Sequence, residues 1–145
     1  MKVLFYASKN DETVNLLRKI IETVLKGKNL EGNLECYQTI DRLSQSLQMP
    51  EDKQAIAVLL PHNRDELLKI CSIRYLLHDL RLILILPDEE DETISIGHWL
   101  RPRFLSYIDS NLEDVIDVLT KMLAGYGQSK NQLTKQTVIE RRVIV

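Results

Sequence analysis

The chain has 145 residues, of which 44% are hydrophobic and 28% are charged, a composition sufficient for one domain to close a core without disulfide bonds. Its formal net charge is -2, whereas a face that binds duplex nucleic acid needs clustered Lys and Arg to neutralise phosphates. The composition therefore favours one compact domain and gives no reason to expect nucleic acid or acidic substrates as partners.

The cysteines and the apolar runs indicate where the protein works. Cys36 and Cys71 lie far apart in the sequence, and we interpret both as free thiols of a reducing compartment. Together with His78 and His98 they show none of the short ligand spacings of a zinc site. The apolar run within residues 1–6 is too short for a signal peptide, and no segment approaches the roughly 18 apolar residues of a membrane span. We therefore expect a cytoplasmic protein without a membrane partner.

Short apolar runs alternate along the chain with longer segments of helical period. The short runs predict strands over about residues 3–7, 34–40, 55–60, 82–86 and 104–108. The longer segments predict helices over about residues 10–26, 41–47, 63–77, 93–100 and 111–124. Two of these helices should begin with a capping box, an acceptor side chain followed three residues later by glutamate, at residues 63–66 and 110–113.

Strands that alternate with helices predict an α/β fold with a parallel sheet covered on both faces, because parallel neighbours need crossover connections. The strands at residues 3–7, 55–60 and 82–86 are apolar on both faces and should be central. Those at residues 34–40 and 104–108 carry polar positions that an edge tolerates. We predict a flavodoxin-like, doubly wound five-stranded sheet of strand order 2-1-3-4-5, in which ligands bind beyond the carboxyl ends of the first and third strands.

The composition changes after residue 124, which divides the chain into a domain over residues 1–124 and an extension over residues 125–145. Residues 125–132 are polar and resemble a linker, and residues 138–145 are apolar and β-branched, which we interpret as a strand. Exposed strand-like termini readily pair with another edge. We therefore expect a homodimer formed through the extension or through a face of the domain. The open alternatives are that the extension folds back on its own sheet or binds a different protein.

The alternation of elements, the helix lengths and the last strand, which ends at residues 104–109 before a capped amphipathic helix, carry a resemblance to a known family. Over about residues 1–124 the chain resembles the receiver domain of bacterial two-component response regulators. That family uses an acidic pair after its first strand, an aspartate ending the third, a Thr or Ser ending the fourth and a Lys ending the fifth. The matching positions here hold Ala7, Ser8 and Lys9, then Leu60 and Pro61, then Leu86 and Pro87, and finally Asp109.

These departures remove the chemistry that the resemblance would otherwise imply. Phosphoryl transfer to an aspartate needs a carboxylate nucleophile, a divalent ion and a cation beside the developing charge. Leu60 and Pro61 cannot attack a phosphoryl group, and the charge of Asp109 would repel it. Asp11 and Glu12 could form a replacement metal pair, but the helix dipole already explains acids in a first turn. The resemblance therefore implies a pseudoreceiver: a non-enzymatic interaction module of bacterial signal transduction or regulation, without cofactor or metal, whose protein partner the sequence does not identify.

A competing hypothesis is small-molecule binding, for example of a flavin, or weak catalysis in the crevice at the carboxyl ends of the first and third strands. Ser8, Pro61 and His62 should lie there, and His62 is the general-base candidate. Residues 8–13 fall where a flavin phosphate loop would be, but they contain no glycine for close backbone approach. Aromatic residues that could hold a flavin are also missing after the third strand.

Two further groups of residues suggest contact surfaces. The acidic run at residues 88–92 is interpreted as a solvated loop whose last acids favour a helix start, with a basic partner surface as the alternative. An apolar group around Trp99 is our first choice of interaction face, because the corresponding face of receivers commonly binds partners. Its members are Ile94, Ile96, Trp99, Leu100 and Tyr107, of which some should pack on the sheet.

Overall fold

The computed structural model describes residues 2–49 and 55–125. Within them the strands are β1 (Lys2–Ala7), β2 (Leu34–Tyr37), β3 (Ala55–Leu60), β4 (Arg81–Leu86) and β5 (Phe104–Tyr107). The helices are α1 (Glu12–Gly27), α2 (Ile40–Gln48), α3 (Arg64–Ser72), α4 (Arg74–Leu77), α5 (Asp91–His98) and α6 (Leu112–Gly125). The strand predicted at residues 138–145 lies outside the described residues.

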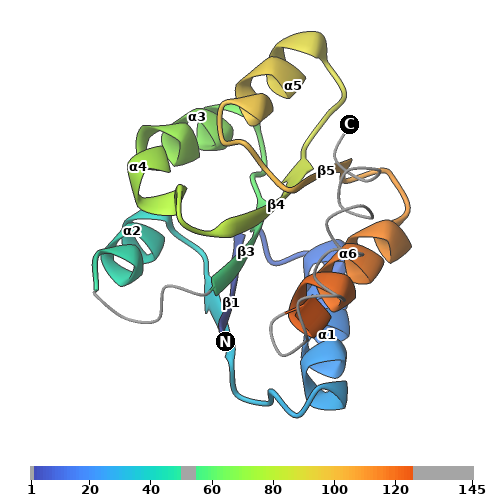
Figure 1. The fold of residues 1–145 in the computed structure, drawn as a ribbon. Helices are drawn as coiled ribbons and strands as arrows, with labels where there is room; N and C mark the ends of the chain where they lie inside the picture. The colour runs from blue at the N-terminus through green and yellow to red at the C-terminus, as the bar shows by residue number, and fades with distance from the viewer. Residues whose placement is uncertain (1, 50–54, 126–145) are drawn as a thin grey trace.

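The strands form one parallel sheet in the order β2-β1-β3-β4-β5 (Figure 1). β1 pairs with β3 along its whole length, from Lys2 opposite Ala55 to Ala7 opposite Leu60. This arrangement confirms the predicted α/β class, the flavodoxin-like strand order and the edge positions of β2 and β5. All the carboxyl ends of the strands consequently meet at one edge of the sheet.

Helices cover both faces of the sheet (Figure 1). α1 and α6 pack on one face, where Phe5, Val58 and Ile83 belong to the same buried cluster. Helices α2, α3, α4 and α5 supply the second cluster, which includes Leu59 and Leu84 from the opposite face. Successive strand residues thus alternate between two cores, which is why the central strands are apolar throughout. No helix in the described part of the chain combines the length and apolar character needed to cross a membrane.

Gly97 lets α5 lie unusually close to β4. A Cβ atom at this buried position would lie 3.2 Å from Cδ2 of Leu84 and 3.2 Å from Cδ2 of Leu86. Side chains in a close-packed core rarely approach so closely. The absence of a side chain at Gly97 therefore sets how deeply α5 packs on the sheet.

The helix predicted over residues 63–77 is two helices in the structure. α3 begins as predicted, because Oδ1 of Asn63 accepts a hydrogen bond from the backbone amide of Glu66 at 2.9 Å. It ends at Ser72, whose hydroxyl bonds back to a carbonyl three residues earlier, a local bond that competes with helical geometry. Ile73 follows with φ −108° and ψ 19° and packs against the core, so the chain turns before α4.

Two other helix starts also differ from the sequence prediction. α2 begins at Ile40, because the Thr39 side chain accepts a hydrogen bond from the amide of Arg42 at 3.2 Å. The predicted second strand is correspondingly shorter and ends at Tyr37. α5 begins at Asp91, two residues before the predicted start, and the acidic segment thus enters its first turn.

α6 starts where the second capping box was predicted, but a different side chain caps it. Oδ1 of Asn111 accepts a hydrogen bond from the amide of Glu113 at 2.9 Å. The Ser110 hydroxyl instead donates to the Tyr107 carbonyl at 2.7 Å, a turn contact at the end of β5. Asn111 is therefore the N-cap of α6, because it accepts a hydrogen bond from a backbone amide in the first turn.

Candidate functional site

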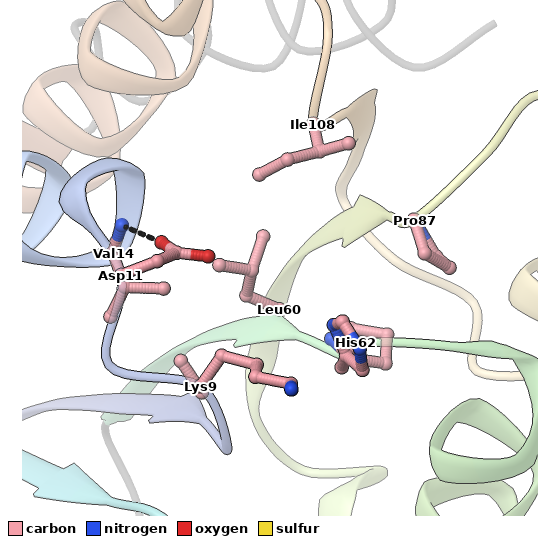
Figure 2. Close-up of a pocket in the computed structure, with 9 residues that line it drawn as sticks. Lys9, Asp11, Val14, Leu60, His62, Pro87 and Ile108 are labelled. Atoms are coloured by element: carbon pink, nitrogen blue, oxygen red, sulfur yellow. Dashed lines mark hydrogen bonds between the residues drawn. The ribbon is translucent and has the colours of Figure 1, made fainter.

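A crevice lies at the carboxyl ends of the strands, where the fold predicts a ligand site (Figure 2). Its volume is about 240 Å³, and it is lined by Ala7, Lys9, Asp11, Val14, Leu60, Pro61, His62, Pro87 and Ile108. Most of these side chains are aliphatic, and only Lys9, Asp11 and His62 among them are polar. The crevice is therefore small and mainly apolar.

The positions singled out in the sequence divide into two groups. Ala7, Leu60, Pro61 and Pro87 line the crevice, whereas Ser8, Leu86 and Asp109 are not among its lining residues. The Leu86 side chain is fully buried in the core beneath α5. Asp109 is exposed beyond the end of β5. The end of β3 thus presents aliphatic side chains to the crevice, and no carboxylate ends that strand.

The acidic group nearest the crevice has a structural role. Oδ1 of Asp11 accepts a hydrogen bond from the backbone amide of Val14 at 2.9 Å and caps α1 (Figure 2). Glu12 occupies the first helical turn, where the dipole favours it. The described residues contain no group of three His, Cys, Asp or Glu side chains that could hold a metal ion. The helix-start interpretation of Asp11 and Glu12 accounts for their positions.

Beside the crevice, Glu66 of α3 accepts three hydrogen bonds. Its carboxylate receives the Ser8 hydroxyl at 2.6 Å, the Tyr6 hydroxyl at 3.0 Å and the backbone amide of His62 at 3.2 Å. Burial raises the pKa of Glu66, but the hydrogen bonds from Ser8, His62 and Tyr6 outweigh it, so the pKa lies below its usual range. Burial and the Glu66 carboxylate together raise the pKa of Tyr6. This cluster joins the carboxyl ends of β1 and β3 to α3.

The sequence pattern places Glu66 only in a capping box and does not indicate this role. The available signal was strand alternation, because Tyr6 and Ser8 are two residues apart and share the sheet face on which α3 packs. Ser8 and His62, both expected at the crevice, contact the same carboxylate of Glu66. The Ser8 hydroxyl donates to Glu66 and not to the His62 ring, so the pair has no hydrogen bond that would activate a nucleophile.

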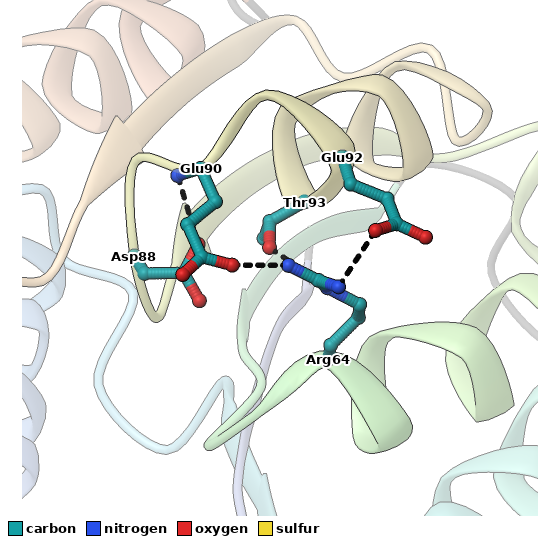
Figure 3. A network of polar contacts seen from close by, with 5 residues as sticks. All are labelled: Arg64, Asp88, Glu90, Glu92 and Thr93. Atoms are coloured by element: carbon teal, nitrogen blue, oxygen red, sulfur yellow. Dashed lines mark hydrogen bonds and ion pairs between the residues drawn. The ribbon is translucent and has the colours of Figure 1, made fainter.

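The acidic run at residues 88–92 is tied to α3 by Arg64 (Figure 3). The guanidinium contacts the carboxylates of Glu90 and Glu92, the latter at 2.9 Å, and Nε donates to the Thr93 hydroxyl at 3.2 Å. Hydrogen bonds from the Thr93 hydroxyl and the Glu90 amide lower the pKa of Asp88. Asp91 and Glu92 lie in the first turn of α5 as predicted, but the run is also an ion-paired connection between two helices.

The members of the predicted interaction face differ in exposure. Trp99 is 53% exposed, whereas Leu100 is 6% exposed and Ile96 is 5% exposed. Ile94 and Tyr107 are partly buried and pack against the second core cluster. Trp99 is therefore the member whose side chain is available for contact.

The two cysteines belong neither to the lining of the crevice nor to the predicted interaction face. Cys36 and Cys71 are both free, and they lie on β2 and α3 respectively. Burial raises the pKa of the Cys71 thiol, which disfavours its reactive thiolate form.

Comparisons with protein-family models, with curated proteins and with solved structures found no match.

Proposed function

We propose that the chain is a receiver-like domain without a phosphoacceptor, which acts through protein contacts in bacterial signal transduction or regulation. The observation that carries the proposal is the end of β3, where Leu60 and Pro61 line the crevice in a sheet of order β2-β1-β3-β4-β5. A cytoplasmic location and a homodimer paired through the extension are parts of the same proposal.

The polar groups around the crevice support this function over phosphoryl transfer. Transfer needs a free carboxylate and a divalent ion that bridges the phosphoryl oxygens. Asp11 caps α1, and Glu66 already accepts from three donors. Hydrogen bonds of this kind stabilise the negative charge of a carboxylate, which makes either group a weaker nucleophile.

Incubation with acetyl phosphate and Mg²⁺, followed by intact-mass measurement, tests the proposal. We expect no added phosphoryl group on a carboxylate, because Leu60 and Pro61 stand at the end of β3. A phosphorylatable receiver treated in parallel controls for the reagent. A labile phosphoaspartate mapped to the crevice would overturn the proposed function.

A second candidate function is the binding of a small molecule in the crevice. The observation in its favour is that Lys9 and His62 line the crevice, whose volume is about 240 Å³, since ligand sites combine apolar walls with a few polar groups. Native mass spectrometry of the purified protein would reveal a copurified ligand. Its loss in a Lys9→Ala variant would favour this candidate, and a mass equal to that of the bare chain would count against it.

A further inference from the structure

A second and larger hollow lies at the opposite edge of the sheet from the crevice. Its volume is about 750 Å³, and its lining comes from α4, the turn into β4, the end of α5 and the turn into β5. β4 and β5 begin where these turns end, so the cavity lies at the amino ends of the two strands. We call it the amino-end groove.

The amino-end groove has an apolar floor with exposed aromatic side chains on its walls. Leu77 and Leu100 are 1% and 6% exposed and anchor the floor in the core. Tyr75 and Trp99 are 63% and 53% exposed, and they are the only exposed aromatic side chains within residues 2–49 and 55–125. Aromatic side chains beside a fixed apolar surface are typical of binding hot spots.

The amino-end groove is positively charged. Arg74 and Arg101 line it together with His78 and His98, and no carboxylate belongs to the lining. Neither guanidinium forms an ion pair with another described residue, whereas the Arg64 guanidinium is held by two glutamates. Asp79 follows the lining residue His78, and its carboxylate lies 3.3 Å from Nε2 of that ring. Two guanidinium charges without an ion-pair partner among the described residues therefore line one cavity of a chain with net charge -2.

The backbone of Arg101 has an uncommon conformation at the rim. Its φ is 51°, in the left-handed region that few residues other than glycine adopt. It also precedes Pro102, and a residue before proline ordinarily prefers an extended conformation. Its amide donates to the His98 carbonyl at 3.1 Å, which holds the turn at the end of α5. Such local strain is concentrated at functional sites.

From these observations we propose that the amino-end groove binds an acidic peptide segment of a partner protein, with an apolar or aromatic side chain of the peptide packed between Tyr75 and Trp99. The inference rests on the proposed function, in which the chain acts through protein contacts. Guanidinium groups bind carboxylates through paired, charge-assisted hydrogen bonds. The aromatic walls and leucine floor would bury the apolar side chain of the peptide.

Charge complementarity favours a different protein over a second copy of this chain. The acidic run of a second copy is the obvious internal candidate, but Glu90 and Glu92 already pair with Arg64 in their own chain. Pairing two grooves about a twofold axis would bring like charges together. A nucleic acid fits less well, because a phosphate backbone requires a longer row of cations than two arginines.

The test uses the full chain and a short fluorescein-labelled peptide of aspartate and glutamate around a central phenylalanine. Binding is followed by fluorescence anisotropy and by the emission of Trp99, which is the only tryptophan in the chain. We expect saturable, salt-sensitive binding that shifts the Trp99 emission. Arg74→Ala and Arg101→Gly should each weaken it about tenfold, which corresponds to about 1.4 kcal/mol.

Three controls make the result specific. Arg42→Ala removes the same charge from an exposed position on α2 and should leave binding unchanged. Arg101→Gly suits the left-handed backbone, so its thermal unfolding should show an intact fold. A peptide with lysine in place of the acidic residues should not bind.

Several outcomes would overturn the inference. They are the absence of saturable binding, an equal loss in Arg42→Ala, and tighter binding of a single-stranded oligonucleotide than of the acidic peptide. Self-association that disappears in Arg101→Gly would assign the groove to a second copy instead. Phosphorylation of the crevice would overturn the proposed function alone. A captured partner that still binds the Arg74→Ala and Arg101→Gly variants would overturn only the assignment of the groove.

Discussion

The carboxyl-end crevice and the amino-end groove differ in how their polar groups are satisfied. At the crevice, Asp11 caps a helix and Glu66 accepts from three donors. At the groove, Arg74 and Arg101 have no ion-pair partner among the described residues, and two aromatic side chains face solvent. Polar groups that satisfy one another stabilise a fold, whereas unsatisfied ones remain available to bind. At the carboxyl-end edge, where this fold usually binds ligands, the polar side chains are therefore more fully paired within the protein than those at the amino-end groove.

The largest expected effect is on dimerisation. It shows whether the groove or the extension holds the dimer together. We expect the full chain to sediment as a dimer and a chain that ends at Ala124 to sediment as a folded monomer. Trp99→Ala should remain dimeric, because pairing two positively charged grooves is unfavourable. Sedimentation velocity across the micromolar range measures all three.

Two results would break this view of the dimer. If all three proteins are monomeric, the dimer proposal fails, and the extension becomes a candidate docking peptide for another protein. If the protein ending at Ala124 loses cooperative unfolding, the extension is part of the core. Dissociation by Trp99→Ala alone would show that the groove pairs with itself, contrary to the charge argument.

The next largest effect is on stability, and it tests whether the hydrogen bonds of Glu66 stabilise the fold. Glu66→Ala leaves the hydroxyls of Tyr6 and Ser8 without their acceptor, and the Tyr6 side chain is buried. We expect the free energy of unfolding to fall by about 2 kcal/mol. Glu66→Gln keeps an acceptor oxygen and should lose about half as much, roughly 1 kcal/mol. Urea denaturation measures both, and equal stability of all three proteins would show that the cluster contributes nothing.

The smallest effect is the pH dependence that the same cluster produces. Hydrogen bonds hold the pKa of Glu66 below its usual range, so the folded state favours the ionised form. The resulting stability is complete above the unfolded pKa of about 4.3, and it is lost as pH falls through the lower folded pKa. The wild type should therefore lose stability more steeply than Glu66→Gln below about pH 5. Parallel pH profiles of the two proteins would contradict the lowered pKa.

Much of the fold could be predicted because its signals are local. The continuous apolar run of β3 gives the same bounds, Ala55–Leu60, in sequence and structure. The break at Ile73 was missed because the helical period continues across it, while a side-chain bond at Ser72 and core packing decide the turn. Propensity and pattern do not register such tertiary effects.

The two sites were predicted to different degrees for a related reason. The crevice follows from the fold, since its position depends only on strand order. The groove does not, because Tyr75 and Trp99 come from separate segments and line one cavity only when α4 and α5 pack on the same face. In the sequence, Trp99 is marked by its apolar neighbours, several of which belong to the core. The arginines beside it carried no sequence signal of their own.

The close packing of α5 on β4 at Gly97 also affects the amino-end groove. A Cβ atom at this position would press on the Leu84 and Leu86 side chains of β4, and either these leucines or the helix would have to give by a few tenths of an ångström to restore ordinary contact. Trp99 caps the carboxyl end of the same helix, and the Arg101 amide is bonded to the His98 carbonyl, so a displacement of α5 would pass to both. The position of one wall of the groove thus depends on packing inside the core, at a residue that no binding partner could touch.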